Sequence, residues 1–539
     1  MRKAEFSRRT FLMGSTAVGL AAAGVRPGRA GGLSLSGARG LGPGGSLLRP
    51  GSRPYPHLPP GTDTIPQLEH IVVLMMENHS FDDHLGMLGR GDGLTLGPGG
   101  EPVNYNPDPA GGYVRSFHLP NTWNPSGPGI SQSWDASHIC WDNGTNMGFV
   151  KGCTPAAMGY WDRTDIPFYY GMASQFPIGD RYFCSVMAQT YPNRRFLIAG
   201  SALGDVSTDT SGISVGDAPN GTIFDRLDEH GISWYDYFPD VATAALFLAV
   251  TESHPTRMVD DPNRFLSDAA AGRLPAFSLV DPYVDWSEEN NDISVGEAYA
   301  ARIINAVLES PKWDKTALFW VYDEHGGWFD HVPPVPAVKP DNVPPEIHVP
   351  PDQPGAYDYT GFRVPCCVVS PWAKRDHVSH QIYDHTSILK FLETKWNLPA
   401  LTYRDANALN MLDFFDFGAK GPPFAEPPTL PAPKNPFVGP LPRSSPEAAR
   451  HAIGHPVADS SLPAAKYRSK TKPPQADALI AAHTAAALGR TLTPSSGAGS
   501  DVAAIVSGLG GGAVVIAGAA ATALYLRRKH AATPPETVA

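Results

Sequence analysis

The sequence predicts an α/β fold with a parallel sheet at its centre, and three observations support this class. Several short apolar runs end abruptly at acidic or small polar residues, as buried strands of such sheets do. A segment with helical spacing lies between two of these runs, which gives the strand–helix–strand order of parallel neighbours. Polar residues gather directly after the runs, where open α/β sheets bind their ligands.

The apolar runs, in chain order, are Ile71–Met76, Ala276–Val280, Ala317–Tyr322 and Cys366–Val369. They end at Glu77, Asp281, Asp323 and Ser370, respectively. The helical segment is Gly296–Leu308, between the second and the third run. Since parallel strands present their carboxyl ends at one edge of the sheet, we expect carboxylates from separate strands to converge there.

Composition divides the chain of 539 residues into a central domain and unusual flanks. The periodic and apolar segments lie in residues 66–420, where we expect one large domain. Residues 31–65 are rich in Gly, Pro and Ser, which indicates a linker. Residues 421–500 are rich in Pro, Ala and Ser, which indicates a stalk.

Both ends carry export or membrane patterns. Residues 1–30 are predicted to be a twin-arginine signal segment, because Ser7-Arg8-Arg9-Thr10-Phe11-Leu12 precedes an apolar stretch. Residues 502–526 form an uncharged run that is long enough for a transmembrane anchor. Arg527-Arg528-Lys529 follow, which predicts a cytoplasmic tail at 527–539 and the central domain on the extracytoplasmic side of the cell membrane. The alternatives are a chance Arg pair and a soluble Ala/Gly-rich segment.

Net charge and cysteine spacing exclude two classes of function. A formal net charge of -11 argues against a nucleic-acid partner, which would require a basic surface. The five cysteines contain no CxxC spacing, which argues against a zinc–thiolate site. If a disulfide forms, Cys140 and Cys153 are the nearest candidates in sequence apart from the adjacent Cys366-Cys367.

The segment after the first apolar run has the residue types of a metal site. Glu77 and Asn78 offer hard oxygen ligands of the kind that divalent cations prefer. From the residues alone, a polar turn that caps the next helix is the alternative. This segment resembles the signature Glu-Asn-x-Ser-Phe-Asp-x-x-x-Gly of the bacterial phosphoesterase family, which contains phospholipases C and acid phosphatases. Here its sequence is Glu77-Asn78-His79-Ser80-Phe81-Asp82-Asp83-His84-Leu85-Gly86.

A second block strengthens the resemblance. Residues 322–334 are similar to the family's Tyr-Asp-Glu-x-x-Gly-x-x-Asp-His-Val-Pro-Pro block. The matches cover most of residues 66–400. The resemblance implies an alkaline-phosphatase-like central sheet flanked by helices. It also implies a divalent metal ion of unknown identity, bound by Glu77, Asn78, Asp323 and Glu324.

The candidate nucleophile is Thr190, in Gln189-Thr190-Tyr191-Pro192-Asn193-Arg194. Pro192 suits the first turn of a helix, so Thr190 would lie at a helix N-terminus, where phosphate is favoured. From the residues alone, Thr190 could equally be an N-cap. The resemblance implies a nucleophilic Thr or Ser at this place, with Ser185 as the second candidate. Arg194 would contact phosphate or cap a neighbouring loop.

Two histidines are further candidates. His138 lies in a stretch similar to the family's His-containing segment, which implies a phosphate contact or a proton donor to the leaving group. It lies between two Trp residues, so a packed core position is the alternative. Asp384-His385-Thr386-Ser387 resembles a family block near the end of the domain. His385 either lines the site or only begins the helix Ile388–Trp396.

One stretch departs from the family. Members carry a His-Pro segment before the Gly-Glu that here is Gly296-Glu297, but residues 286–292 contain neither His nor Pro.

Together, the motifs and the terminal patterns predict an exported, membrane-anchored hydrolase of phosphoric esters, with phospholipase C-type cleavage of glycerophospholipids as the first expectation. A broad acid phosphatase on small phosphate monoesters is the alternative. A non-catalytic surface protein that binds phosphate or lipid is the alternative from another class.

Overall fold

The computed structural model describes residues 47–122, 130–208, 218–283, 292–443, 464–472 and 477. Its centre is an eight-stranded sheet with the strand order β12-β6-β11-β10-β1-β9-β7-β8. The strands of this sheet are β1 His70–Met76, β6 Ile178–Gly179, β7 Trp234–Tyr237, β8 Met258–Val259, β9 Phe277–Val280, β10 Thr316–Tyr322, β11 Cys366–Val369 and β12 Val378–Ser379. The predicted α/β class, a central sheet flanked by helices, is confirmed.

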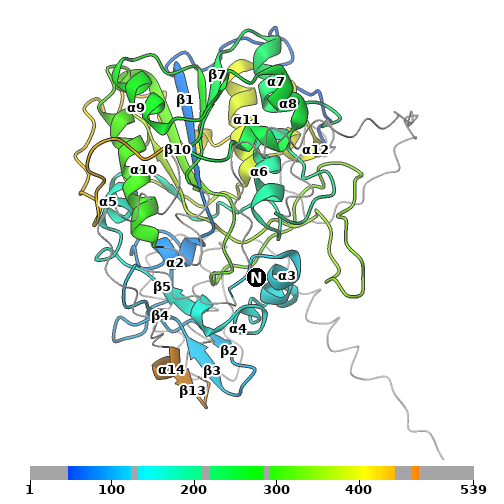
Figure 1. The fold of residues 1–539 in the computed structure, drawn as a ribbon, viewed down its shortest axis with the longest axis vertical. Helices are drawn as coiled ribbons and strands as arrows, with labels where there is room; N and C mark the ends of the chain where they lie inside the picture. The colour runs from blue at the N-terminus through cyan, green and yellow to red at the C-terminus, as the bar shows by residue number, and fades with distance from the viewer. Residues whose placement is uncertain are drawn as a thin grey trace, which may run out of the picture. The chain divides into compact units, whose positions relative to one another are not determined.

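Helices cover both faces of the sheet. The longer ones are α3 Trp134–Trp141, α5 Pro167–Gln175, α6 Thr190–Ala199, α7 Ile223–Glu229, α8 Leu248–Ser253, α9 Pro262–Ala270, α10 Ile293–Leu308 and α11 His385–Trp396. The short ones are α2 Phe81–Leu85, α4 Phe149–Gly152 and α12 Tyr403–Ala406. In Figure 1, α9 and α10 lie on one side of β1 and β10, and α6 and α11 lie on the other. Because both faces are covered, the strands read as continuous apolar runs.

The strand β1 is the middle of the sheet. It pairs in parallel with β10 on one side and with β9 on the other. All six residues of Ile71–Met76 are fully buried, which explains the uninterrupted apolar run. Met76 lies opposite Tyr322 in the register, so Glu77 and Asp323 leave the sheet at the same level. The predicted strand and the shared edge are confirmed, and β1 lies between β9 and β10, the two strands of the predicted strand–helix–strand unit.

The sheet is mixed, where a parallel sheet was expected. Strand β11 runs antiparallel to β10, with Leu318 opposite Val369. The end of β11 therefore lies at the opposite edge, and the Ser370 hydroxyl donates to the carbonyl oxygen of Thr316 at the start of β10. An apolar run records burial on both faces but not strand direction, so the sequence could not distinguish the two cases.

Of the two predicted helices, one starts earlier than the apolar pattern suggests, and the other starts where the Asp384-His385 sequence predicts. The first begins at Ile293, because the side chain of Asp292 accepts a hydrogen bond from the backbone N–H of Ser294. The second begins at His385, with Asp384 capping Thr386 in the same way. A capping carboxylate satisfies N–H groups that have no partner within the helix, so each helix starts directly after its acid.

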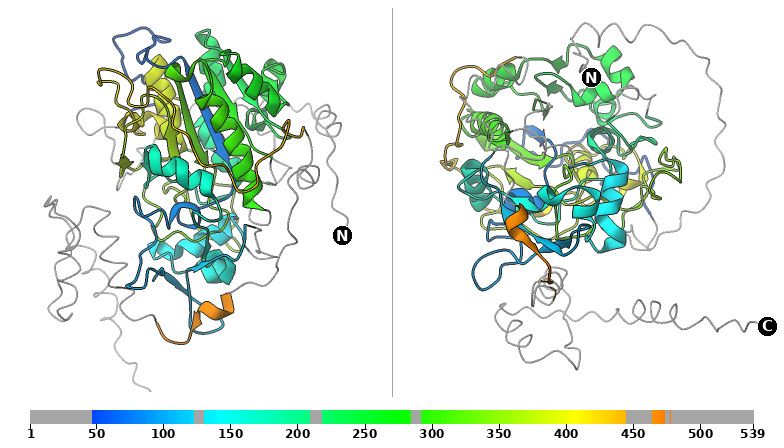
Figure 2. Two further views of the ribbon diagram at one scale, coloured as in Figure 1. Left: turned by 90° about the vertical axis from the view of Figure 1, so that its left-hand side faces the viewer. Right: turned by 60° about the horizontal axis from the view of Figure 1, so that its bottom comes forward.

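Residues outside the expected domain limits also pack against it. In the stretch assigned to the linker, the backbone N–H of Tyr55 donates to Asn397. In the stretch assigned to the stalk, Phe424, Phe437 and Leu441 are buried. A small sheet holds a further piece: β13 Arg468–Ser469 pairs with β3 Tyr113–Arg115, which pairs with β2 Tyr105–Pro107. Figure 2 shows α14 Ala464–Tyr467 and β13 in orange beside these blue strands.

The predicted terminal segments lie outside the described residues. These are the signal segment 1–30, the anchor 502–526 and the tail 527–539. Within the described part of the chain, no helix has both the length and the apolar composition to cross a membrane.

Candidate active site

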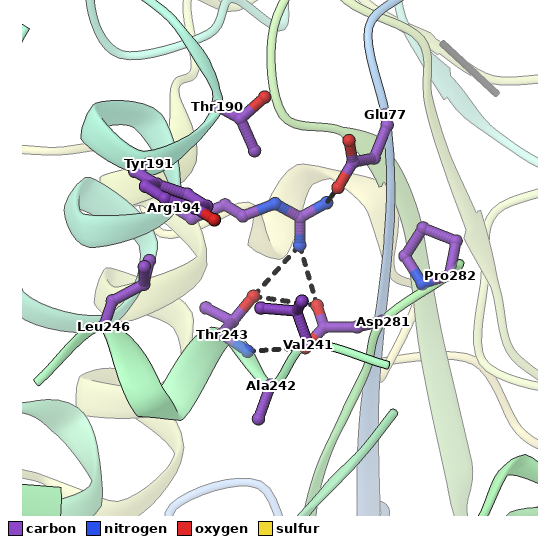
Figure 3. Close-up of a pocket in the computed structure, with 10 residues that line it drawn as sticks. All are labelled: Glu77, Thr190, Tyr191, Arg194, Val241, Ala242, Thr243, Leu246, Asp281 and Pro282. Carbon is purple, nitrogen blue, oxygen red and sulfur yellow. Dashed lines mark hydrogen bonds and ion pairs between the residues drawn. The ribbon is translucent and has the colours of Figure 1, made fainter. Parts of the chain in front are cut away.

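The site lies at the shared edge where β1, β9 and β10 end. Glu77, Asp281 and Asp323 each follow one of these strands directly, and each is at most 3% exposed. A pocket opens there, lined by Glu77, Thr190, Tyr191, Arg194, Val241, Ala242, Thr243, Leu246, Asp281 and Pro282 (Figure 3). The convergence of carboxylates that the sequence predicts is thus observed, at the edge where open α/β sheets bind ligands.

Asn78 holds the centre of the site in an unusual backbone conformation. Its φ is 63°, in the left-handed region that non-Gly residues seldom adopt. Its N–H donates to Asp323 Oδ1 at 3.0 Å, and its own Oδ1 accepts from the Thr190 hydroxyl at 3.3 Å. A Cβ at position 326 would lie 2.0 Å from the Asn78 carbonyl oxygen. The backbone at position 326 can therefore approach Asn78 this closely only because the residue is glycine. Strained positions of this kind concentrate at functional sites.

Thr190 is the first residue of α6 and lines the pocket. The predicted helix start at this position is observed, and Gln189 rather than Thr190 occupies the N-cap. In Figure 3 the Thr190 side chain stands above the Arg194 guanidinium, on the same side of the pocket as Glu77. Ser185, the second candidate nucleophile, is fully buried and is not among the residues that line the pocket.

Arg194 is the internal cation of the site. Its Nε donates to Asp323 Oδ2 at 3.1 Å, its Nη1 to Asp281 Oδ1 at 2.7 Å, and its Nη2 to Glu77 Oε1 at 3.0 Å. Nη1 also donates to Thr243, and Nη2 approaches backbone carbonyls of β1. Burial alone would lower its pKa, but the three carboxylates raise it well above the usual range. Its donors are thus directed at protein oxygens, and a phosphate contact from Arg194 stays a prediction.

The four predicted metal ligands directly follow β1 and β10, and their residue types suit a divalent cation, although of the four only Glu77 lines the pocket. Glu77, Asn78, Asp323 and Glu324 are each at most 3% exposed and offer oxygen ligands. Three of them are carboxylates, and burial raises the pKa of Asp323 even though Arg194 acts in the opposite direction. Several carboxylates around one guanidinium leave excess negative charge in a medium that solvates it poorly. A bound divalent cation would neutralise that charge, so the residues present fit the implied metal.

Glu324 is oriented by the turn that follows β10. Its Oε2 accepts from the backbone N–H of Gly326 at 2.8 Å and lies 3.3 Å from His325 Nδ1. Burial lowers the pKa of His325 to about 3, so this histidine is neutral near pH 7. The turn therefore orients Glu324 without neutralising it.

His385 lies behind the site. Its Nε2 donates to the carbonyl oxygen of Asp323 at 2.7 Å, and its Nδ1 lies 3.0 Å from the Tyr182 hydroxyl. It is fully buried and is not among the residues that line the pocket. Burial lowers its pKa to about 4. This geometry fits a neutral ring that positions the Asp323 backbone.

His138 is not among the residues that line the described pocket. It lies on α3, and its ring centroid lies 4.2 Å from that of Trp134, with the two rings tilted by 35°. Its Nδ1 lies 2.8 Å from the Trp134 carbonyl oxygen. A Cβ at position 355 would lie 2.4 Å from its Nε2, so Gly355 covers that nitrogen. Burial lowers the pKa of His138. No recorded contact connects it to Thr190 within the described residues, and its proposed role in catalysis stays a prediction.

Two pocket residues that hydrogen-bond to Arg194 were not among the predicted site residues. Asp281 follows β9 as Glu77 follows β1, so its strand-end position was the signal that could have identified it. Its two oxygens accept from Thr243 and Arg194. Thr243 comes from a 3₁₀ turn, Thr243–Leu246, and nothing in the sequence marks it.

The altered residues 286–291 lie outside the described part of the chain.

A second buried cluster, here called the support cluster, contains Asp82 from the first signature block and Asp330 and His331 from the second. It consists of Asp82, Asp92, Arg181, Asp330, His331 and Arg363. Arg363 pairs with Asp82 at 2.9 Å and with Asp330 at 2.8 Å. His331 lies 2.7 Å from Asp82. Burial alone would lower the pKa of His331, but Asp82 and Asp92 raise it to about 10.

Three groups of His and Asp in the described residues also have ligand atoms within 4.8 Å of one another. They are His79, Asp83 and His84; Asp82, Asp330 and His331; and His118, Asp162 and Asp165. The first group is fully buried among aromatic rings, and the third is partly exposed. None of the three contains a predicted ligand.

Comparisons with known proteins agree with these motifs. A family model described as Phosphoesterase family matches residues 68–399. Phospholipase C B of Mycobacterium tuberculosis is 31% identical over 446 residues, which cover 71% of this chain and 83% of that protein. Hemolytic phospholipase C of Pseudomonas aeruginosa is 29% identical over 427 residues, 67% of this chain and 57% of that protein.

Among solved structures, a protein in the alkaline phosphatase superfamily from Vibrio parahaemolyticus matches with a TM-score of 0.33 and 10% identity, over 66% of this chain and 71% of that one. The family match covers more than half of the sequence and includes both signature blocks. The protein therefore belongs to the Phosphoesterase family and is an enzyme that hydrolyses phosphoric esters.

Proposed function

We propose that the enzyme is a phospholipase C-type hydrolase that cleaves glycerophospholipids at the bond between diacylglycerol and phosphate. Thr190 is the nucleophile. The observation that carries this proposal is the position of Thr190: it is the first residue of α6, it lines the pocket, and its hydroxyl lies 3.3 Å from Asn78 Oδ1. Relatives named phospholipase C support the substrate class.

The chemistry divides between Thr190 and the groups around it. The Thr190 hydroxyl loses its proton and its oxygen bonds to phosphorus, while the bond from phosphorus to the glycerol oxygen breaks and diacylglycerol leaves with a proton on that oxygen. Water later hydrolyses the phosphothreonine and restores the Thr190 hydroxyl. A divalent cation held by Glu77, Asn78, Asp323 and Glu324 would lower the pKa of the hydroxyl and neutralise the phosphoryl oxygens. Asn78 orients the Thr190 hydroxyl, and the N-terminus of α6 favours the phosphate.

The charge of the pocket favours a diester over a monoester. Glu77 and Asp281 line it, and the N–H donors of Arg194 are directed at protein oxygens. A phosphomonoester dianion would therefore meet more repulsion there than a singly charged diester. Tyr191, Val241 and Leu246 supply an apolar wall that suits an apolar leaving group.

The test is an assay of Thr190→Ala on phosphatidylcholine and on an aryl phosphate, with and without a chelator. We expect the variant to lose activity on the order of 10³-fold or more, and Thr190→Ser to retain a measurable part of it. Ser185→Ala is the matched control, because Ser185 is buried away from the pocket. Full activity of Thr190→Ala would exclude the nucleophile assignment, and a preference for the aryl phosphate would favour a broad phosphatase.

A non-catalytic phosphate- or lipid-binding protein is the second candidate, and one observation favours it. Residues 286–292 lack the His-Pro segment typical of the family. Binding of phosphatidylcholine vesicles without turnover, across several divalent metals, would support this candidate. Turnover that a chelator abolishes would exclude it.

We further propose that the enzyme is exported by the twin-arginine pathway and anchored in the cell membrane with its catalytic domain outside. The Arg8-Arg9 pattern and the uncharged run 502–526 before Arg527-Arg528-Lys529 support this placement. Replacing Arg8-Arg9 by Lys-Lys should retain the protein inside the cell. Protease added to intact cells should remove the domain of the unaltered protein but leave the retained variant intact.

A further inference from the structure

The pair Cys140 and Cys153 lies where two short helices make close contact. Cys140 is the seventh residue of α3, and Cys153 follows the last residue of α4 as its C-cap. Their sulfur atoms are 3.7 Å apart, across 13 residues of sequence. No disulfide joins the five cysteines, all of which lie among the described residues.

Glycines build this contact. A Cβ at position 148 would lie 1.7 Å from the carbonyl oxygen of Ile139. A Cβ at position 152 would lie 2.9 Å from the carbonyl oxygen of Ala136 and 3.0 Å from Cys140 Sγ. Gly148 and Gly152 therefore allow the backbones of α3 and α4 to approach closely enough for a cross-link, since a disulfide requires nearby Cβ atoms.

The other cysteines offer no comparable partner. Cys366 and Cys367 are neighbours on β11, where successive side chains point to opposite faces of a strand. Cys184 lies with its sulfur against position 361 and 3.6 Å from the Val186 carbonyl oxygen. Among the described residues, Cys140 and Cys153 are thus the pair of cysteines whose sulfur atoms are in contact.

We propose that Cys140 and Cys153 form a structural disulfide that fixes α3 and α4 beside the metal-ligand turn. Cys153 reaches the turn through Ser131, whose carbonyl oxygen lies 3.3 Å from Cys153 Sγ. The thiol donates to this oxygen, and the disulfide, which has no S–H, retains only the packing contact. A Cβ at position 327 would lie 2.8 Å from the Ser131 nitrogen, so Gly327 packs directly on Ser131. The cross-link therefore supports the segment that follows Glu324.

The oxidation needs a disulfide donor, either a protein disulfide or a small one such as oxidised glutathione. Cys153 is partly exposed and Cys140 is fully buried, so the donor exchanges first with Cys153. The Cys153 sulfur bonds to one donor sulfur and releases the other as a thiol. The Cys140 thiolate then attacks Cys153 Sγ and releases the second donor thiol. Two cysteine thiols lose two protons and two electrons, and the donor disulfide gains them.

The test uses the full-length protein incubated with oxidised glutathione, then denatured and alkylated without reduction. Mass spectrometry should find three alkylated cysteines and a linked pair of peptides that contain Cys140 and Cys153. In Cys153→Ser no linked pair should form and four cysteines should be alkylated. Cys184→Ser is the matched control and should keep the link. Five alkylated cysteines after oxidation, or a link between another pair, would overturn the proposal.

Thermal unfolding separates a supporting disulfide from an incidental one. Closing a loop of this length should raise the unfolding midpoint of the oxidised protein by about 3–6 °C. Reductant should reverse the rise, and Cys153→Ser should show neither change. The structural role would be contradicted if the unfolding midpoint of Cys153→Ser changed with oxidant and reductant as much as that of the unaltered protein. It would also be contradicted if the linked protein showed no shift. Neither readout depends on catalysis, so the outcome is independent of the proposed function.

Discussion

Two clusters of buried charge arise from the same two signature blocks, and they differ in charge balance. The site cluster consists of Glu77, Arg194, Asp281, Asp323 and Glu324. There, a single guanidinium contacts three carboxylates, with a fourth carboxylate next in sequence. In the support cluster, three carboxylates meet two guanidinium groups and a histidine whose pKa is raised to about 10.

The difference shows how neighbouring residues of one motif acquire different tasks. In the support cluster, cationic side chains of the protein neutralise Asp82, Asp92 and Asp330, so the cluster needs no ligand. In the site cluster, carboxylates outnumber guanidinium groups, and a bound divalent cation would restore the balance. We therefore expect changes in the support cluster to lower stability, and changes in the site cluster to lower metal affinity and activity.

The largest expected effect on stability is that of Arg363→Met. The change leaves Asp82 and Asp330 without their shared guanidinium in a fully buried place, which should cost about 3–5 kcal/mol of unfolding free energy. Lys374→Met is the control, because its pair with Asp413 is partly exposed and contributes about 0–1 kcal/mol. Denaturant unfolding at pH 7 measures both. Equal, small effects would remove the distinction between the support cluster and a surface pair.

A pH series tests the same cluster without a substitution. The folded pKa of His331, about 10, lies above the usual value of 6.5. Its contribution is therefore fully present below pH 6.5 and is lost as the pH rises through 10. We expect the free energy of unfolding to fall by up to about 4 kcal/mol between these values. The fall should be smaller in His331→Gln; an identical profile would contradict the assignment.

The smallest effect is expected at Asp236, directly behind the site cluster. Burial, reinforced by the neighbouring Asp281, raises the pKa of Asp236 well above its usual range, which favours the neutral carboxyl form. Asn has nearly the same shape and is also neutral, so Asp236→Asn should change stability by less than about 1 kcal/mol. Asp281→Asn should weaken the anchoring of Arg194 and reduce kcat more strongly. A large loss in Asp236→Asn would show that this carboxyl is charged.

Sequence reasoning found the parts of the molecule that have local causes. Strands β1 and β10 followed from apolar runs buried on both faces, and α11 followed from a capping Asp384. Glu77, Asn78, Asp323 and Glu324 were predicted to share a metal site. They follow the ends of the neighbouring strands β1 and β10, and their binding of a common metal stays a prediction.

Contacts between distant segments were the part that the sequence could not supply. The direction of β11, the pairing of Arg194 with Asp281, and the position of His385 behind Asp323 all depend on how separate elements pack. No local pattern distinguishes Asp323 from Asp330 as acids of different tasks, although they are seven residues apart. Only the partners that surround each carboxylate separate a site residue from a supporting one.

Metal content tests the division between the two clusters most directly. The full-length protein, dialysed against metal-free buffer and analysed by inductively coupled plasma mass spectrometry, should hold about one divalent cation per chain. Asp323→Asn, in the site cluster, should lose that ion, and folded Asp330→Asn, in the support cluster, should keep it. Loss of the metal from Asp330→Asn with retention by Asp323→Asn would contradict the account.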